Sequence, residues 1–272
     1  MSRLFTFGCS FTKYYWPTWA DAIADNFSEF QNWGRPGAGN LFISNSVAEC
    51  NARNDINSTD TVIVMWSGFT RLDYYSDNGW CCVSSSEDFS ADIQELITLR
   101  GRAIRDLGFI AQTKHMLDAL GCTYYFTSML DLNTSLAPLG YKEFHGKIDQ
   151  DQTQDVLNVY KKYVDIFLPS AQQILYKNYQ DWFSKPKPDG TTSVRSDLHP
   201  WPSEHLEIAT SLFPQFAVSD STYKWFYNEQ VKLSQFFTNT TNRDGTYKKD
   251  LDAADIKKRL TSKIDNSQPE RF

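Results

Sequence analysis

The chain has 272 residues, of which 41% are hydrophobic and 22% are charged, and its formal net charge is −6. This composition predicts a packed globular core, and the negative charge argues against nucleic acid or an anionic membrane surface as a partner. No apolar run is long enough to cross a bilayer, and no signal peptide is visible. The five cysteines form no CxxC pair, so we expect reduced thiols in a cytoplasmic protein with no metal site.

Four apolar segments predict strands, and helical segments separate them. The strands are expected at residues 4–7, 30–33, 61–66 and 123–130, and the helices at 18–27, 40–54 and 91–120. Asn40 is expected to cap the second helix, Gly121 to end the third, and a break in the third is expected near Gly101 or Gly108. This alternation of strands and helices predicts a parallel sheet with right-handed crossovers, hence a three-layer α/β/α sandwich.

The remaining segments are less regular in pattern. Residues 73–87 are expected to be irregular, and helices are expected at 151–167, at 171–183 and from Ser203 to about 213. The tail is polar with an aromatic start; it predicts a loop at 239–247 and an amphipathic helix at 252–264. We therefore expect one α/β domain at residues 1–218 and a C-terminal extension at 219–272, which packs on the domain or projects from it.

Complementary catalytic side chains occur at the two ends of the predicted domain. Ser10 follows the first strand at a Gly turn, where a sheet can hold a nucleophile rigidly. His199 lies in a turn before the last helix of the domain, and Asp197 is close enough in sequence to orient it, as in a Ser-His-Asp triad. Cys9 is an alternative nucleophile and His205 an alternative base. The sequence contains neither a phosphate-binding loop nor a dinucleotide-binding glycine motif, so we expect no cofactor.

Three short blocks resemble the SGNH, or GDSL-like, hydrolases. Residues 7–12 (Phe-Gly-Cys-Ser-Phe-Thr) are similar to the nucleophile block of that family. Residues 32–40 (Asn-Trp-Gly-Arg-Pro-Gly-Ala-Gly-Asn) resemble its second block, and residues 197–200 (Asp-Leu-His-Pro) resemble its last block. The resemblance implies a flavodoxin-like parallel sheet, Ser10 as nucleophile, and backbone N–H groups of Ser10 and Gly37 as oxyanion donors, with Gly39 as the next match after Gly37.

The third block of the family, Gly-x-Asn-Asp, has no Asn at the matching turn here. Residues 66–71 read Trp-Ser-Gly-Phe-Thr-Arg, so Ser67, Thr70 or Arg71 is a candidate replacement for the missing amide. Asn40 is a further candidate oxyanion donor. The last block is also shortened, because one residue rather than two separates Asp from His. Both departures resemble divergent family members that are common in bacteriophage genomes, which implies a possible virion association.

These features predict a serine esterase that acts through an acyl-enzyme, with a small acyl ester, such as an acetyl group on a sugar, as substrate. Aromatic residues near the expected rim are candidate substrate contacts, namely Tyr14, Trp16, Trp66 and Trp201. The alternative is a catalytically degenerate binding or structural module on the same fold. The sequence does not indicate an oligomeric state.

Overall fold

A computed structural model describes residues 2–83, 98–132, 150–175 and 199–240 of the chain. Its central sheet has the strand order β2-β1-β3-β6, and every neighbouring pair is parallel. The strands are β1 (Arg3–Gly8), β2 (Glu29–Asn32), β3 (Thr61–Trp66) and β6 (Thr123–Ser128). The prediction of a parallel sheet is confirmed, and strand bounds differ from the expected ones by at most two residues.

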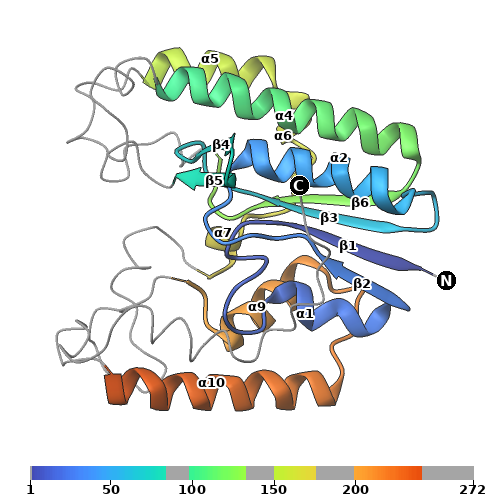
Figure 1. Ribbon diagram of the computed structural model, residues 1–272, viewed down its shortest axis with the longest axis vertical. Coiled ribbons are helices and arrows are strands. Elements are labelled where there is room, and N and C mark those ends of the chain that lie inside the picture. The colour runs from blue at the N-terminus through green and yellow to red at the C-terminus, as the bar shows by residue number, and fades with distance from the viewer. Residues whose placement is uncertain (1, 84–97, 133–149, 176–198, 241–272) are drawn as a thin grey trace.

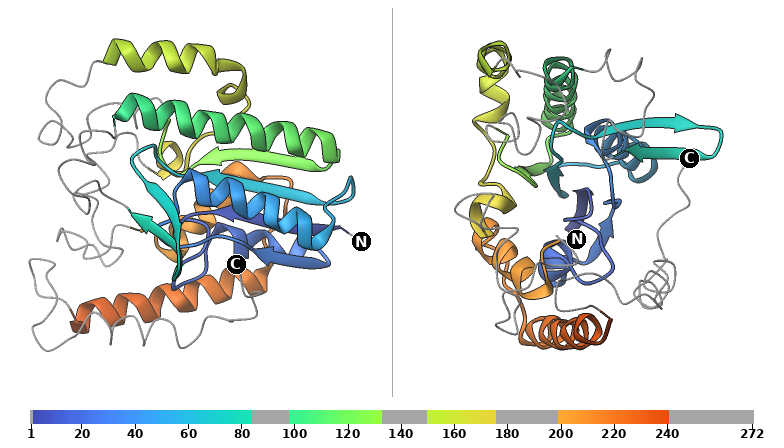
Figure 2. Two further views of the ribbon diagram at one scale, coloured as in Figure 1. Left: turned by 45° about the horizontal axis from the view of Figure 1, so that its top comes forward. Right: turned by 90° about the vertical axis from the view of Figure 1, so that its left-hand side faces the viewer.

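Helices cover both faces of this sheet (Figure 1). One face carries α2 (Asn40–Asn54) and α4 (Leu99–Leu120), and the other carries α1 (Trp19–Ile23) and α9 (Pro202–Leu212). Beyond these layers lie α5 (Gln150–Val159), which packs on α4, and α10 (Asp220–Thr240), which packs on α9 (Figure 2). Shorter helices are a 3-10 turn (Ala24–Asn26), α6 (Lys161–Val164) and α7 (Ala171–Leu175). The expected three-layer α/β/α sandwich is therefore confirmed.

The core follows directly from the sequence of the strands. All six residues of β3 are buried, as the continuous apolar run predicted, because helices pack on both faces of a parallel sheet. Among the described residues, no helix is both long enough and apolar enough to span a membrane.

Two expectations about helix ends were tested by α4. Gly121 ends the helix in the left-handed conformation with a φ of 69°, as predicted. The expected break is wrong, because α4 continues through Gly101 and Gly108. Gly101 lies in the first turn, where its N–H donates to Thr98 Oγ (3.0 Å), so it belongs to the start of the helix. An isolated glycine such as Gly108 costs only about 1 kcal/mol in a helix that tertiary packing supports.

The segment expected to be irregular contains a β-hairpin. Strands β4 (Leu72–Ser76) and β5 (Gly79–Val83) are antiparallel and form a separate two-stranded sheet beside α2. The turn places Gly79 at a φ of 93°, and the dipeptide Asn78-Gly79 is a known hairpin signal. The expectation at residues 73–83 is therefore wrong, and residues 84–87 lie outside the described residues.

Helix α10 covers a segment for which the sequence analysis predicted no helix, and its last two residues contradict the loop expected at 239–247. The start of α10 is linked to the 3-10 turn after α1 through Asp25. The Asp25 carboxylate accepts from Ser219 Oγ (2.9 Å) and Thr222 Oγ (2.7 Å). The helix expected at residues 171–183 is described only as α7. The helix expected at 252–264, and residues 241–247 of the expected loop, lie outside the described residues.

The strand order places a topological switch point at the carboxyl end of β1. The chain leaves β1 through α1 to reach β2 on one side, and then returns through α2 to β3 on the other side. Parallel α/β sheets bind ligands at such switch points, outside the carboxyl ends of the strands. Ser10 and the loop before α2 follow β1 and β2 at this switch point.

Candidate active site

Ser10 lies in a tight turn at the carboxyl end of β1. The N–H groups of Thr12 and Lys13 both donate to Cys9 O, at 2.9 and 3.1 Å. A Cβ at Gly8 would lie 2.1 Å from Thr12 Oγ and 2.9 Å from a backbone oxygen of β3. Only glycine therefore allows the strand to close into this turn, which fixes the position of Ser10.

His199 lies within hydrogen-bond distance of Ser10, although the two residues are 189 positions apart in sequence. The distance from Ser10 Oγ to His199 Nε2 is 2.8 Å, and Ser10 is 2% exposed. His199 directly precedes α9, which begins at Pro202. When Nε2 is unprotonated, the Ser10 hydroxyl donates to it, which is the arrangement of a nucleophile and its general base.

The alternative nucleophile and base are placed differently. Cys9 is fully buried, and its Sγ lies 3.5 Å from Met129 Sδ, so it faces the core. His205 is also fully buried within α9, and burial lowers its pKa to about 3. No described residue forms a hydrogen bond with either ring nitrogen of His205. Asp197, the expected orienting carboxylate, lies outside the described residues.

The loop that contains Gly37 is tied to the nucleophile turn. Arg35 N–H donates to Gly8 O (3.0 Å), and Asn32 joins the two segments by accepting from Gly34 N–H (3.0 Å) while donating to Thr12 O (2.8 Å). Gly37 itself has a φ of 82°, a left-handed conformation that strongly favours glycine.

Asn40 braces this loop against the end of β3. Its Oδ1 accepts from Ser67 N–H (2.8 Å), and its Nδ2 donates to Ser67 O (3.0 Å) and to Asp106 Oδ2 (2.8 Å). Both amide hydrogens are thereby engaged within the fold. The structure therefore places the Asn40 side chain as a brace, and not as the free oxyanion donor that the sequence analysis considered.

Arg71 supports the same loop from the turn after β3. Its Nη1 donates to Ala38 O (3.0 Å), next to Gly37, and its Nη2 lies 3.8 Å from Met129 Sδ. Since Met129 also contacts Cys9, the guanidinium lies near the base of the nucleophile turn. Of the other two candidates, Ser67 is fully buried and its hydroxyl has no hydrogen-bond partner among the described residues, and the Thr70 backbone carbonyl accepts from Arg102.

The aromatic residues expected to contact substrate lie in three different environments. Tyr14 stacks on His199, with ring centroids 3.9 Å apart and an interplanar angle of 23°. Trp16 and Trp201 are each 4% exposed and share a small cluster with α10. Trp66 is fully buried in the main core against Phe126, so its expected substrate contact is wrong in this structure, because the continuously buried β3 points it inward.

Two carboxylates of the site region were not identified from the sequence. Asp73 accepts from the N–H groups of Gly39 (2.8 Å) and Phe42 (2.9 Å), so it caps α2 in place of Asn40. Asp106 accepts from Asn40 and from Arg105 Nε (2.6 Å). Among the described residues, no group of three or more His, Cys, Asp or Glu side chains is arranged to hold a metal ion.

Comparison with known proteins gives likenesses to solved structures only. No family model matches the sequence, and no curated protein matches it. The chain is similar to a member of the lipolytic G-D-S-L family from Veillonella parvula, at 10% identity and a TM-score of 0.44, over 79% of this chain and 98% of that chain. It is similar to a GDSL-like lipase from Bacteroides thetaiotaomicron at 16% identity and a TM-score of 0.43, over 82% and 88% of the two chains. A carbohydrate acetylesterase from Sinorhizobium meliloti has 13% identity and a TM-score of 0.37, over 79% and 98%.

Proposed function

We propose that the chain is a serine esterase that hydrolyses a small acyl ester, with an acetylated carbohydrate as the substrate class. The observation that carries this proposal is the 2.8 Å distance between Ser10 Oγ and His199 Nε2, at the switch point where this kind of sheet binds ligands. A serine hydroxyl is a weak nucleophile, and it needs a base at this distance to react.

The reaction divides into two acyl transfers. His199 Nε2 removes the proton as Ser10 Oγ attacks the ester carbonyl carbon, and it then returns the proton to the leaving alcohol. The resulting acyl-enzyme is hydrolysed by a water molecule that His199 deprotonates. In this proposal Asp197 orients His199, and the negative charge on the tetrahedral intermediate is held by the backbone N–H groups of Ser10 and Gly37.

Arg71 has a supporting role in the proposed oxyanion site. Its hydrogen bond to Ala38 O fixes the Ala38–Gly39 peptide of the loop that contains Gly37, and its positive charge favours an anion nearby. A fixed set of donors lowers the barrier because no reorganisation is needed when charge develops. Arg71 therefore takes over part of the function of the missing Asn by holding a backbone donor in place.

The test is hydrolysis of p-nitrophenyl acetate by the wild type and by Ser10→Ala. We expect kcat to fall by at least about 1,000-fold in the variant, because the nucleophile is lost. Ser28→Ala is the matched control, since Ser28 is an exposed serine next to β2 that bonds only to Ser2 O among the contacts described. Equal turnover by Ser10→Ala and the wild type would refute the proposal.

A non-catalytic module is the second candidate, and the 2% exposure of Ser10 favours it. A fluorophosphonate reagent separates the two, because it forms a covalent adduct only with an activated serine. Labelling of Ser10, seen as a mass increase on its peptide, supports the esterase. A folded protein that is not labelled supports the binding module.

A further inference from the structure

A stack of aromatic rings covers one face of His199. Tyr14 lies almost parallel to the imidazole, with ring centroids 3.9 Å apart. Trp16 and Tyr14 form a T-shaped pair, with ring centroids 4.5 Å apart at an interplanar angle of 82°. Phe11 contacts the imidazole edge-on, with centroids 6.0 Å apart. The ring of His199 is thus held by neighbours that come from the loop directly after Ser10.

The backbone that follows His199 is fixed by the same cluster. Trp16 Nε1 donates to Pro200 O (2.7 Å), and this bond is buried. Trp201 N–H donates to the carboxylate of Glu204 (2.8 Å) at the start of α9. One tryptophan therefore both supports the Tyr14 ring and holds the peptide next to His199.

Helix α10 closes this cluster from the outside. Leu233 and Phe237 are 4% and 2% exposed and pack with Trp16 and Trp201. The rings of Trp201 and Phe237 lie 5.6 Å apart at an interplanar angle of 31°. Figure 1 shows α10 as the outermost element on this side of the molecule, separated from the sheet by α1 and α9. The cluster is thus a direct packing connection from the far helix to the loop of His199.

We propose that this cluster positions His199 for catalysis, and that α10 contributes to this positioning through Leu233 and Phe237. Tyr14, Trp16, Trp201 and Phe237 are the positioning residues: Tyr14 stacks on the imidazole of His199, and the other three act through Tyr14 or through the backbone that follows His199. Catalytic groups must be held within a fraction of an ångström of the productive geometry, and a displacement of about 1 Å can cost on the order of 100-fold in rate. This inference rests on the proposed esterase function, and it reassigns Trp16 and Trp201 from substrate contact to support.

The first test removes the ring on α10. In Phe237→Ala we expect kcat for p-nitrophenyl acetate to fall about 10-fold or more, while KM changes less than about 2-fold, because substrate contacts are unchanged and only the alignment of His199 is lost. Phe237→Leu should retain most of the activity, since it fills much of the same space. Tyr227→Ala is the matched control, because Tyr227 is an aromatic residue of the same helix that is 69% exposed. An unchanged kcat in folded Phe237→Ala would overturn the proposal.

The second test does not depend on activity, and its first variants change a partly exposed residue. Tyr14 is partly exposed, so Tyr14→Leu removes the stacked ring with less risk to folding, and Tyr14→Phe keeps the ring. In NMR spectra of the full chain with labelled histidine, the ring of Tyr14 should shift the His199 imidazole signals upfield. We expect that shift to persist in Tyr14→Phe, to disappear in Tyr14→Leu, and the His199 signals to broaden in Phe237→Ala.

These readouts separate failure of this inference from failure of the proposed function. If the wild type neither hydrolyses esters nor reacts with the fluorophosphonate, but the NMR changes occur as expected, the esterase proposal fails while the support of His199 stands. If the wild type is an active esterase and the His199 signals are the same in Tyr14→Leu and Phe237→Ala as in the wild type, the positioning role is refuted.

Discussion

Asp106 is a fully buried carboxylate beneath the proposed oxyanion loop. It accepts hydrogen bonds from Asn40 and Arg105, which favour its charged form. Burial has the larger effect and raises its pKa to about 6, and the negative charge of Asp73 acts in the same direction. Removing a charged group from water disfavours ionisation more than two hydrogen bonds restore it. Asp106 is therefore a residue whose charge state changes within an ordinary working pH range.

This shift predicts a specific dependence of stability on pH. Because the pKa of Asp106 is higher in the folded than in the unfolded chain, the folded state binds more protons between about pH 4 and pH 6. The contribution of Asp106 to stability is therefore complete below pH 4 and is lost as the pH rises through 6. From a shift of about 2 units, the loss is on the order of 3 kcal/mol.

The measurement is the unfolding free energy of the wild type minus that of Asp106→Asn, from urea titrations at pH values between 4 and 8. We expect this difference to fall as pH rises, because Asn does not titrate but can still accept from Asn40. A difference that stays constant over this range would show that Asp106 titrates alike in the folded and unfolded chain.

Sequence patterns singled out Ser10 and His199 as candidate nucleophile and base, but they did not predict the supporting roles of Asn40, Asp106 and Trp16. A serine after a strand and a histidine before a helix are recognisable because strand ends and helix starts are local properties. The roles of Asn40, Asp106 and Trp16 depend on partners from 27 to 184 residues away in sequence. Which buried polar group bonds to which is set by packing, and a single sequence carries no record of it.

The same distinction holds for the secondary-structure elements. The strands of the main sheet were predictable because apolar β-branched runs need no partner to be recognised. The β4–β5 hairpin was missed because its strands carry polar and aromatic residues, although Asn78-Gly79 was a usable signal. Helix α10 was missed because its exposed aromatic residues obscure the buried stripe, which consists of Thr222, Phe226, Leu233 and Phe237. That stripe has the spacing of one helix face.

The hairpin has a clear effect on its neighbour, because Asp73 of β4 caps α2. Its carboxylate accepts from the N–H groups of Gly39, just before the helix, and of Phe42, in its first turn, and it lies at the positive end of the helix dipole. We expect Asp73→Ala to lower the unfolding free energy by about 1–2 kcal/mol, and Asp73→Asn to lower it less, since one oxygen acceptor remains. Urea denaturation measures both, and equal stability of Asp73→Ala and wild type would show that the cap contributes nothing.

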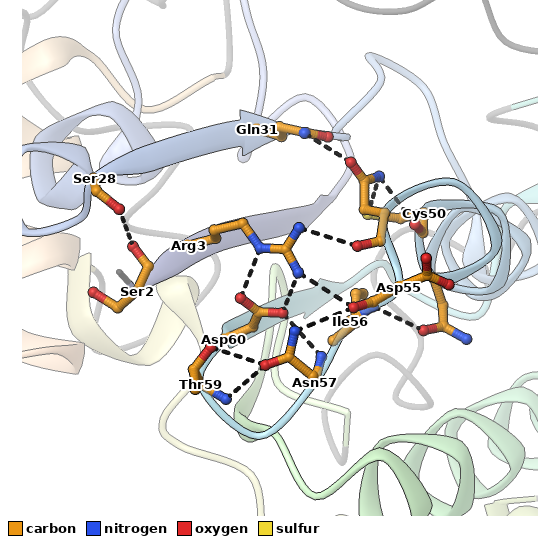
Figure 3. A network of polar contacts seen from close by, with 12 residues as sticks. Ser2, Arg3, Ser28, Gln31, Cys50, Asp55, Ile56, Asn57, Thr59 and Asp60 are labelled. Carbon is orange, nitrogen blue, oxygen red and sulfur yellow. Dashed lines mark hydrogen bonds and ion pairs between the residues drawn. The ribbon is translucent and has the colours of Figure 1, made fainter.

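The two ends of the parallel strands have different roles. Ser10 and the loops around it lie at the carboxyl ends of the strands. A polar network centred on Arg3 lies at the amino ends (Figure 3). Arg3 donates to both oxygens of Asp60, at 2.8 and 2.6 Å, and to the carbonyls of Asn54 and Asp55 at the end of α2. This network joins β1, the C-terminal end of α2 and the start of β3, and it lies at the opposite end of the strands from the proposed active site.

This separation predicts that a substitution at the amino ends of the strands can reduce stability without a loss of catalysis. The Asp60 side chain is fully buried, so Arg3→Ala leaves a buried carboxylate without its main partner. We expect a loss of about 3 kcal/mol in the unfolding free energy at pH 7, with kcat and KM for p-nitrophenyl acetate unchanged at a temperature where the variant is folded.

The pH dependence of this loss has a defined sign. Burial acts to raise the pKa of Asp60, but the hydrogen bonds from Arg3 and from Asn57 N–H together lower it below its usual value. The stabilisation is therefore present above about pH 3.8, the usual pKa, and is lost as the pH falls further. The unfolding free energies of wild type and Arg3→Ala should thus converge in acid, as measured by urea titrations at pH 3 and pH 7. A kcat that falls in parallel with stability would show instead that the two ends of the strands are coupled.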